Sequence, residues 1–322
     1  MSVVVLKPGL LTTLQDRGRS GFAALGVGRA GPLDDVAFRL ANALVGNGDE
    51  EAALEFTVSG PRLRFDTDAT IALVGAAFDA RLGARDLPGW QAVRVAAGDV
   101  LDCARVRHGA RAYLAISGGF AVASVLGSRA TDVNTGIGAL GGRALQAGDV
   151  LPIVQRRDAR TPPSAQPWSL DPRPWFDPAP SHPIHLIRGH HFDALDEVSR
   201  EALFAAQFRI SSDSNRVGFR LDGARLALAG PLELVSEAVA FGTVQLPAGG
   251  QPIVLMAEHP TIGGYPRIGQ VAAIDLPRLA QRKPGDPLRF REIGLDDAQT
   301  RYLQRERELA RLLEAITARL HA

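Results

Sequence analysis

Short runs of apolar residues, or of alternating apolar and polar residues, make up most of the first half of the chain. Most of these runs are bounded by Gly, Pro or Asp, a pattern typical of short strands joined by turns. The strands predicted in this way are residues 3–6, 53–58, 62–65, 69–74, 92–95, 101–106 and 112–116. This half is therefore predicted to be mainly β.

Helical spacing of apolar residues is found in a few places only. Pro32 suits a first helical position, an apolar stripe runs over residues 36–45, and Gly46 follows it as a stop signal. The second half predicts helices near residues 193–204 and 276–282, and a tail helix with a stripe of Tyr302, Leu303, Leu309, Leu312, Leu313, Ile316 and Leu320.

A proline-rich segment divides the chain. Eight prolines lie between Arg156 and Pro183, a density that excludes a helix interior or a central strand. The aromatic residues Trp168, Trp175 and Phe176 indicate that this linker is pinned to a surface. The predicted organisation is an N-terminal β unit, a linker, a C-terminal unit and a helical tail, at residues 1–155, 156–183, 184–292 and 293–322.

A weak internal repeat accompanies this division. Gly-Asp followed by a predicted strand occurs at Gly98, Gly148 and Gly285. Gly-Asp before an apolar residue is a turn that begins a new strand. Such repeats fit duplicated barrel-like units, and the lack of regular strand–helix alternation argues against a doubly wound sheet.

Charge and residue usage exclude several classes of protein. In 322 residues, 36 Lys and Arg balance 35 Asp and Glu, which leaves no electrostatic signature of nucleic-acid or anionic-membrane binding. Lys7 and Lys283 are the only lysines, and a proline follows each, so no Lys-Ser/Thr phosphate loop exists. The single Cys103 excludes an internal disulfide and a Cys-rich zinc site. No signal peptide or long apolar run is present, and a cytoplasmic location is predicted.

Three short motifs have a simpler structural interpretation. The G-x-G-x-x-G match at Gly26 lacks the strand and the acidic residue that a dinucleotide site needs, and among 34 glycines a second match, at Gly136, is expected by chance. The histidines of residues 182–191 have no partners to complete a metal site, and no metal is predicted. The amides of Ser117-Gly118-Gly119 suit either an anion site or a plain tight turn.

Polar residues gather in four other stretches. The loop 12–21 contains Gln15, Asp16, Arg17 and Arg19, which bind a ligand or form a salt-bridged loop. The stretch 214–221 carries two arginines, and the stretch 234–254 places Glu237 and Gln245 within apolar runs, where a buried polar group needs a partner. Arg216 and Arg220 are the expected partners, and a solvent-facing Glu237 is the alternative. The fourth stretch, 258–266, carries Glu258, His259, Thr261 and Tyr265 around Gly263-Gly264.

The order and spacing of these motifs resemble the biotin-dependent carboxyltransferase-like family, also called allophanate hydrolase subunit 2, which includes one of the subunits of bacterial 5-oxoprolinase. The matching patterns are T-T-L-Q-D-x-G-R-x-G from Thr12, A-x-L-E-x-T from Ala52, S-x-R-x-G-x-R-L from Ser214, S-E-x-V-x-x-G-x-x-Q-x-P from Ser236 and T-x-G-G-Y-P from Thr261. The resemblance covers about residues 3–292 and implies two cyclophilin-like β-barrel units. It also implies a related smaller partner subunit and, in 5-oxoprolinase, a third lactamase-type subunit.

The resemblance leaves three functions open. The first is a subunit of an ATP-dependent 5-oxoprolinase, with ATP, and magnesium in the complex, driving lactam hydrolysis. The second is a carboxyltransferase subunit for a urea-like or guanidine-like substrate, with a biotinylated partner. The third is a regulator that binds a partner without catalysis. Departures from the family pattern at Asn215, His259, Pro260 and Ile262 leave room for a changed substrate.

We predict a site where the loops 12–19 and 258–265 converge, together with Asn42, Arg216 and Gln245. The amides of Gly263 and Gly264 suit an oxyanion, with Thr261 and Tyr265 as hydroxyl donors. Glu258, His259 or Glu237 would move a proton, and Arg17 and Arg19 would hold a phosphate or carboxylate. The alternative is that both loops only cap the ends of barrels.

Overall fold

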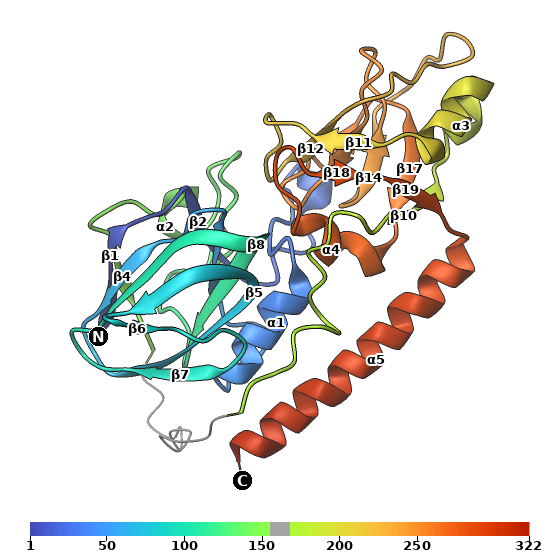
Figure 1. Ribbon diagram of the computed structural model, residues 1–322. Coiled ribbons are helices and arrows are strands. Elements are labelled where there is room, and N and C mark those ends of the chain that lie inside the picture. Colours follow the sequence, from blue (N-terminus) through green and yellow to red (C-terminus); the bar gives the residue numbers. More distant parts are fainter. Residues whose placement is uncertain (155–167, 322) are drawn as a thin grey trace. The chain divides into compact units, whose positions relative to one another are not determined.

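The computed structural model describes residues 1–154 and 168–321. The chain forms two compact units, here called the first unit (Met1–Arg19, Ala30–Pro178 and Glu308–Ala322) and the second unit (Ser20–Arg29 and Ala179–Arg307). Strands dominate both units and a long helix ends the chain (Figure 1), which confirms the mainly β prediction. Most of the predicted linker, residues 155–167, lies outside the described residues.

The first unit is built on one antiparallel sheet, which has nine strands in the part of the chain described here. Its main path is β2-β3-β8-β4-β1-β9, and β5 pairs with β6, β7 and β8. The strands are β1 (Ser2–Lys7), β2 (Leu11–Gln15), β3 (Ala53–Thr57), β4 (Arg62–Phe65), β5 (Ala69–Leu82), β6 (Arg85–Asp86), β7 (Ala92–Val95), β8 (Val100–Ile116) and β9 (Val150–Pro152).

The strand β8 differs from its prediction. The sequence predicts two short strands separated by the partly polar residues 107–111, whereas the structure has one strand of 17 residues. Register shifts opposite residues 75–80 of β5 let the polar part stay paired while the strand bends. One end of β8 pairs with β4 and the other with β3, and β5 pairs with both of these parts of β8.

The helix α1 (Asp35–Leu44) confirms the apolar stripe predicted in this half, but it begins three residues after Pro32, so the first helical position predicted for Pro32 is wrong. Asp34 is its N-cap, and its carboxylate accepts a hydrogen bond from the backbone N–H of Ala37 at 3.0 Å. The buried side of α1 packs in a cluster that also contains Leu309 and Ile316 from the last helix, α5 (Leu295–Leu320). Trp168, Leu170 and Trp175 pack on the same cluster, so the described end of the linker lies on the first unit.

The second unit has a sheet of eight strands in the order β18-β11-β12-β15-β14-β17-β10-β19 within the described residues. A separate two-stranded ribbon pairs β13 with β16. The strands are β10 (Ile184–Arg188), β11 (Phe208–Ile210), β12 (Gly218–Asp222), β13 (Glu237–Ala238), β14 (Thr243–Gln245), β15 (Ile253–Leu255), β16 (Ile262–Gly263), β17 (Arg267–Val271), β18 (Pro287–Leu288) and β19 (Phe290–Glu292), and the longer helices are α3 (Glu197–Ala205) and α4 (Leu276–Ala280).

All three Gly-Asp turns begin a strand, as the sequence predicts. In each, the glycine has a positive φ, between 87° and 91°. The aspartate that follows accepts a hydrogen bond from the N–H three residues earlier, at 2.9 Å for Asp99, 2.7 Å for Asp149 and 3.0 Å for Asp286. The strands β8, β9 and β18 start immediately afterwards.

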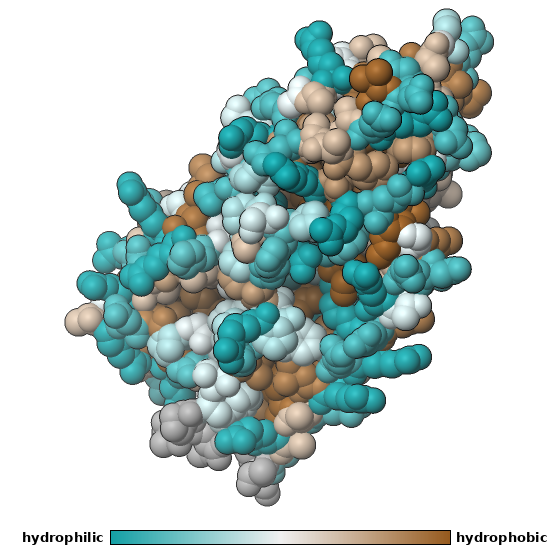
Figure 2. Space-filling model, turned by 45° about the vertical axis from the view of Figure 1, so that its right-hand side comes forward, coloured by the Kyte–Doolittle hydropathy of each residue, from teal (hydrophilic) through white to brown (hydrophobic). Residues whose placement is uncertain are grey.

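The surface mixes hydrophilic residues with smaller hydrophobic areas on the face drawn in Figure 2. Several large apolar side chains are exposed one at a time, as is normal for a folded protein. Among the residues described, no helix has the length and hydropathy needed to cross a membrane.

Candidate functional site

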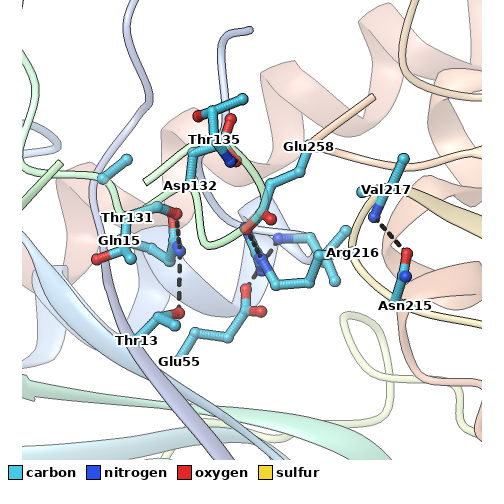
Figure 3. Close-up of polar contacts among 12 residues, drawn as sticks. Thr13, Gln15, Glu55, Thr131, Asp132, Thr135, Asn215, Arg216, Val217 and Glu258 are labelled. Atoms are coloured by element: carbon cyan, nitrogen blue, oxygen red, sulfur yellow. Dashed lines mark hydrogen bonds and ion pairs between the residues drawn. The ribbon is translucent and has the colours of Figure 1, made fainter. Parts of the chain in front are cut away.

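Gln15 ends β2 and is completely buried. Its Nε2 donates to Thr13 Oγ1 and to the carbonyl oxygen of Thr131, both at 2.9 Å (Figure 3). These two acceptors fix the amide, and its Oε1 finds no partner among the described residues. Gln15 therefore ties the end of β2 to the backbone at Thr131. Its Oε1 stays available as a hydrogen-bond acceptor.

Asp16 fastens the same loop to residues 128–129. Its carboxylate accepts hydrogen bonds from Gly18 N–H at 2.9 Å, from Ser128 Oγ at 2.5 Å and from the N–H of Arg129. Because these donors share one buried carboxylate, Asp16 serves as an anchor for the backbone.

The two arginines of this loop have different surroundings. Arg17 has a half-exposed side chain, and its Nη1 lies 3.2 Å from Asp49 Oδ2. Arg19 is 2% exposed and donates to the carbonyl of Ala130. The salt-bridged loop considered from the sequence describes Arg17 well, whereas Arg19 is bound to backbone in the interior.

Asn42 also has a structural environment. Its Nδ2 donates to the carbonyl of Glu51 and its Oδ1 accepts from Asn47, both at 3.0 Å. Asn47 in turn accepts from Gly118 N–H at 2.8 Å, and Gly119 N–H donates to the Ile116 carbonyl. The Ser-Gly-Gly segment is therefore a tight turn whose glycine amides are already bonded.

In the second unit, Arg216 and Glu258 form a buried ion pair. The Nε–Oε1 distance is 2.5 Å, and the two side chains are 3% and 2% exposed (Figure 3). The expected pairing of Arg216 with Glu237 is wrong. Glu237 lies in the short strand β13 outside the main sheet, where its side chain is 46% exposed and pairs with Arg267. The solvent-facing alternative is correct for Glu237, and Arg220 is exposed as well.

Asn215 replaces an aspartate that is usual in the family pattern. Its Oδ1 accepts hydrogen bonds from the N–H groups of Val217 at 2.8 Å (Figure 3) and Gly218 at 3.3 Å. An amide oxygen fills this role as a carboxylate oxygen would, so the turn that carries Arg216 keeps its geometry.

The loop 259–265 presents the candidate donors and the base. His259 Nδ1 lies 2.7 Å from the carbonyl of Pro260 and must donate to it, which leaves Nε2 as an acceptor in the neutral ring. Burial lowers the pKa of His259 below its ordinary value of 6.5, against the opposing effect of the Pro260 hydrogen bond. Tyr265 is 51% exposed, and the Thr261 carbonyl accepts from Val239 N–H.

The structure thus gathers the predicted residues in two groups, each within one unit. Gln15, Asp16 and Arg19 all bond to residues 128–131. Gln245 lies beside Gly263, whose strand partner is Glu237. The convergence of the two loops in one site stays a prediction.

A buried polar network around Glu55 in β3 was not predicted from the sequence. Glu55 Oε2 accepts from the Tyr113 hydroxyl at 2.6 Å and from Leu33 N–H at 3.0 Å, and Tyr113 Oη accepts from Asp34 N–H at 2.8 Å. Burial first, then the charge of Glu55, raises the pKa of Tyr113 well above its ordinary value. The signal was present, because Glu55 interrupts the apolar run 53–56.

The histidines after the linker form no metal site in the described residues, where no group of three His, Cys, Asp or Glu side chains is placed to hold an ion. His190 and His191 contact each other edge to face, with ring centroids 4.9 Å apart. His191 Nδ1 accepts from Arg267 N–H at 3.1 Å, and burial lowers the pKa of His191.

This pair of β units, with the motifs placed as described, defines a class of protein. The model of the carboxyltransferase domain, subdomains A and B, matches residues 25–292, and the chain belongs to this family. The chain is 38% identical to one of the 5-oxoprolinase subunits of Escherichia coli, over 98% of each chain. The same subunit from Haemophilus influenzae is 34% identical over 92% of each chain.

Solved structures of longer proteins contain the same fold. The crystal structure of the K. lactis urea amidolyase matches 98% of this chain with a TM-score of 0.88 at 29% identity. That of the Kluyveromyces lactis urea carboxylase has the same TM-score and identity. The present chain spans only 20% and 29% of those two chains, respectively.

Proposed function

We propose that this chain is a subunit of an ATP-dependent 5-oxoprolinase, which opens the lactam ring of 5-oxoproline to give glutamate. The observation that carries the proposal is the 38% identity to a 5-oxoprolinase subunit over 98% of both chains. In the urea-acting relatives this domain is a small part of a much longer chain, so the present chain matches only a fraction of their length.

The proposed reaction has a defined order. ATP transfers its γ-phosphate to the lactam oxygen, and water adds to the activated ring carbon, after which the ring C–N bond breaks. A second water then releases phosphate from the resulting acyl phosphate. His259 Nε2 is a suitable acceptor for a proton from water, because the ring is neutral at pH 7. Glu258 is engaged by Arg216, so we assign proton transfer to His259 instead.

Negative charge that develops on the substrate oxygen needs nearby donors. The backbone amides of Gly263 and Gly264 and the exposed hydroxyl of Tyr265 are the candidates in this chain. A donor that meets the oxygen only as charge develops lowers the barrier without tightening substrate binding.

Both arginines predicted to bind phosphate have partners within the chain. Arg19 is buried against the Ala130 carbonyl, and Arg17 pairs with Asp49. We therefore assign ATP, with its magnesium, to the assembled complex, in which a related smaller subunit and a lactamase-type subunit join this chain. A cytoplasmic location stays a prediction.

A second candidate is a carboxyltransferase that uses a biotinylated partner and a urea-like substrate. It is supported by the family itself and by the TM-score of 0.88 to the urea carboxylase structure. A regulator that binds a partner without catalysis is the third.

The test is to purify the chain with its partner subunits and to measure ADP release with 5-oxoproline or with urea. We expect 5-oxoproline-dependent ADP release by the complex and none by the chain alone. Urea-dependent turnover that needs a biotinylated partner would select the second candidate, and a complex inactive on both would select the third. Full activity of the chain as a homo-oligomer would contradict the assembly.

A further inference from the structure

Gln245 lies at an irregularity of the second sheet. Val244 pairs with Gly269 of β17, whereas Gln245 pairs with Arg267, so β17 has one extra residue at this point. Bulges of this kind change the direction of a side chain and are over-represented next to active sites. Gln245 is 4% exposed, and its Nε2 finds no hydrogen-bond partner in the described part of the chain.

A backbone strand, not an acceptor, closes off this amide. A Cβ atom added to Gly263 would lie 2.4 Å from Gln245 Nε2, so β16 passes directly against the amide, and a larger residue there would force the Gln245 side chain or the strand to move. A buried donor without an acceptor is unfavourable. Such a donor is retained at a binding site because the ligand supplies the missing acceptor.

The strand that covers Gln245 is weakly attached. The ribbon of β13 and β16 has two register pairs, Glu237 with Gly263 and Ala238 with Ile262. Arg267 of β17 ties the ribbon to the main sheet through an ion pair with the half-exposed Glu237 and a hydrogen bond from its Nη1 to the Ala238 carbonyl at 3.3 Å. The outer side chains of this region are exposed, namely Val235, Ile262 and Tyr265 at 85%, 58% and 51%.

We propose that the β13–β16 ribbon is a flap and that Gln245 Nε2, beneath it, donates to a carbonyl or carboxylate oxygen of a small ligand. Opening admits the ligand oxygen, and closing removes water from around it. The identification of that oxygen as the lactam or carboxylate oxygen of 5-oxoproline rests on the proposed function. The flap and the donor rest on the contacts of Gln245 and Gly263 alone.

The first experiment separates stability from binding. Gln245→Met keeps the volume of the side chain and removes only its amide. Because Nε2 has no partner among the described residues, we expect the variant to melt at or above the temperature of the parent chain. In the assembled complex we expect kcat/KM for 5-oxoproline to fall at least tenfold. A melting temperature several degrees lower would show that the amide has a structural partner, and unchanged kcat/KM would show that it contacts no substrate; either result overturns the proposal.

The second experiment tests the close approach of the strand. Gly263→Ala places a methyl group against Gln245 and should displace the flap, with loss of activity in the complex. The double variant Gly263→Ala with Gln245→Ala removes the collision, so it should regain the melting temperature that Gly263→Ala alone loses. Gly230→Ala, whose Cβ would meet no atom within 4 Å, is the matched control and should behave as the parent. An unchanged melting temperature and activity in Gly263→Ala would overturn the close approach.

The third experiment needs no activity. Hydrogen exchange of the chain should be faster at residues 237–239 than at 243–246, and bound 5-oxoproline in the complex should slow it. Equal protection of both segments would overturn the flap. If the complex neither binds nor turns over 5-oxoproline while the exchange and melting results hold, the proposed function fails and the flap stands, with urea as the next probe.

Discussion

Two buried glutamines end strands in the two units and are held in opposite ways. Gln15 donates both amide hydrogens to fixed acceptors, and its neighbour Asp16 accepts hydrogen bonds from Gly18 of its own loop and from residues 128 and 129. Gln245 has an Nε2 that no described residue pairs, under a two-stranded ribbon. The region around Gln15 is fixed by its own hydrogen bonds, whereas the region around Gln245 keeps a donor available for a ligand. Similar residue types at strand ends therefore do not imply similar roles.

The largest effect is expected from the buried ion pair of the second unit. Glu258→Ala removes the carboxylate of the buried pair from the Arg216 guanidinium and should cost about 3–5 kcal/mol of unfolding free energy. Chemical denaturation of the purified chain measures this cost. A loss below about 1 kcal/mol would mean that water reaches Arg216 in solution.

A rate effect without a stability effect is expected at Tyr265. Tyr265→Phe removes an exposed hydroxyl, so melting should not change. If the hydroxyl stabilises the oxyanion, kcat of the assembled complex should fall about 10²-fold. Parent turnover by this variant would remove Tyr265 from the site.

The first region should show the opposite behaviour. Asp16→Ala leaves the N–H groups of Gly18 and Arg129 without their acceptor and should cost about 1–3 kcal/mol of stability. Denaturation detects the loss, and Asp49→Ala, which removes a partly exposed partner of Arg17 and of Arg39, serves as the control with a smaller cost. Equal costs for the two variants would remove the contrast between the regions.

His259 gives a pH-dependent test of the second region. Its pKa is lowered from 6.5 in the folded chain, so the unfolded chain binds more protons as the pH falls through 6.5. This contribution to stability is present above pH 6.5 and is lost as the pH falls toward the folded pKa. His259→Asn should flatten the dependence of unfolding free energy on pH in this window; an unaltered slope would show that His259 does not titrate differently on folding.

The smallest effect is expected for the surface ion pair. Glu237→Ala should cost about 0–1 kcal/mol, because its carboxylate is half exposed and well solvated. A cost near that of Glu258→Ala would mean that the ribbon is firmly attached. In that case the structure around Gln245 would be as firmly held as the structure around Gln15.

Local patterns predicted local structure well. The helix α1, the Gly-Asp turns and the mainly β fold follow from spacing, caps and turn residues that act within a few positions. Partners far apart in the sequence were not predictable in this way. Glu237 lies 21 residues before Glu258, and nothing local to Arg216 distinguishes the two carboxylates. Only the placement of β13 outside the main sheet decides the pairing.

Burial of single polar residues was partly predictable. A polar residue inside an apolar run signals a buried group, which is correct for Gln245 and would also have identified Glu55. The same signal is wrong for Glu237, because β13 has only two residues, both exposed, and lies outside the main sheet. Glu55 and Tyr113 are 58 positions apart in the sequence. Only the pairing of β3 with β8 brings them together.

The long strand β8 has a consequence for folding kinetics. Its two ends pair with β4 and β3. The register shifts between β8 and β5 lie between these two ends, so they set how one end is aligned relative to the other. A single residue inserted between Val106 and Gly109 would reverse the inward and outward faces of one end relative to the other. Pairings this distant in sequence form slowly, so the chain must close these long loops before either half of the sheet is secure.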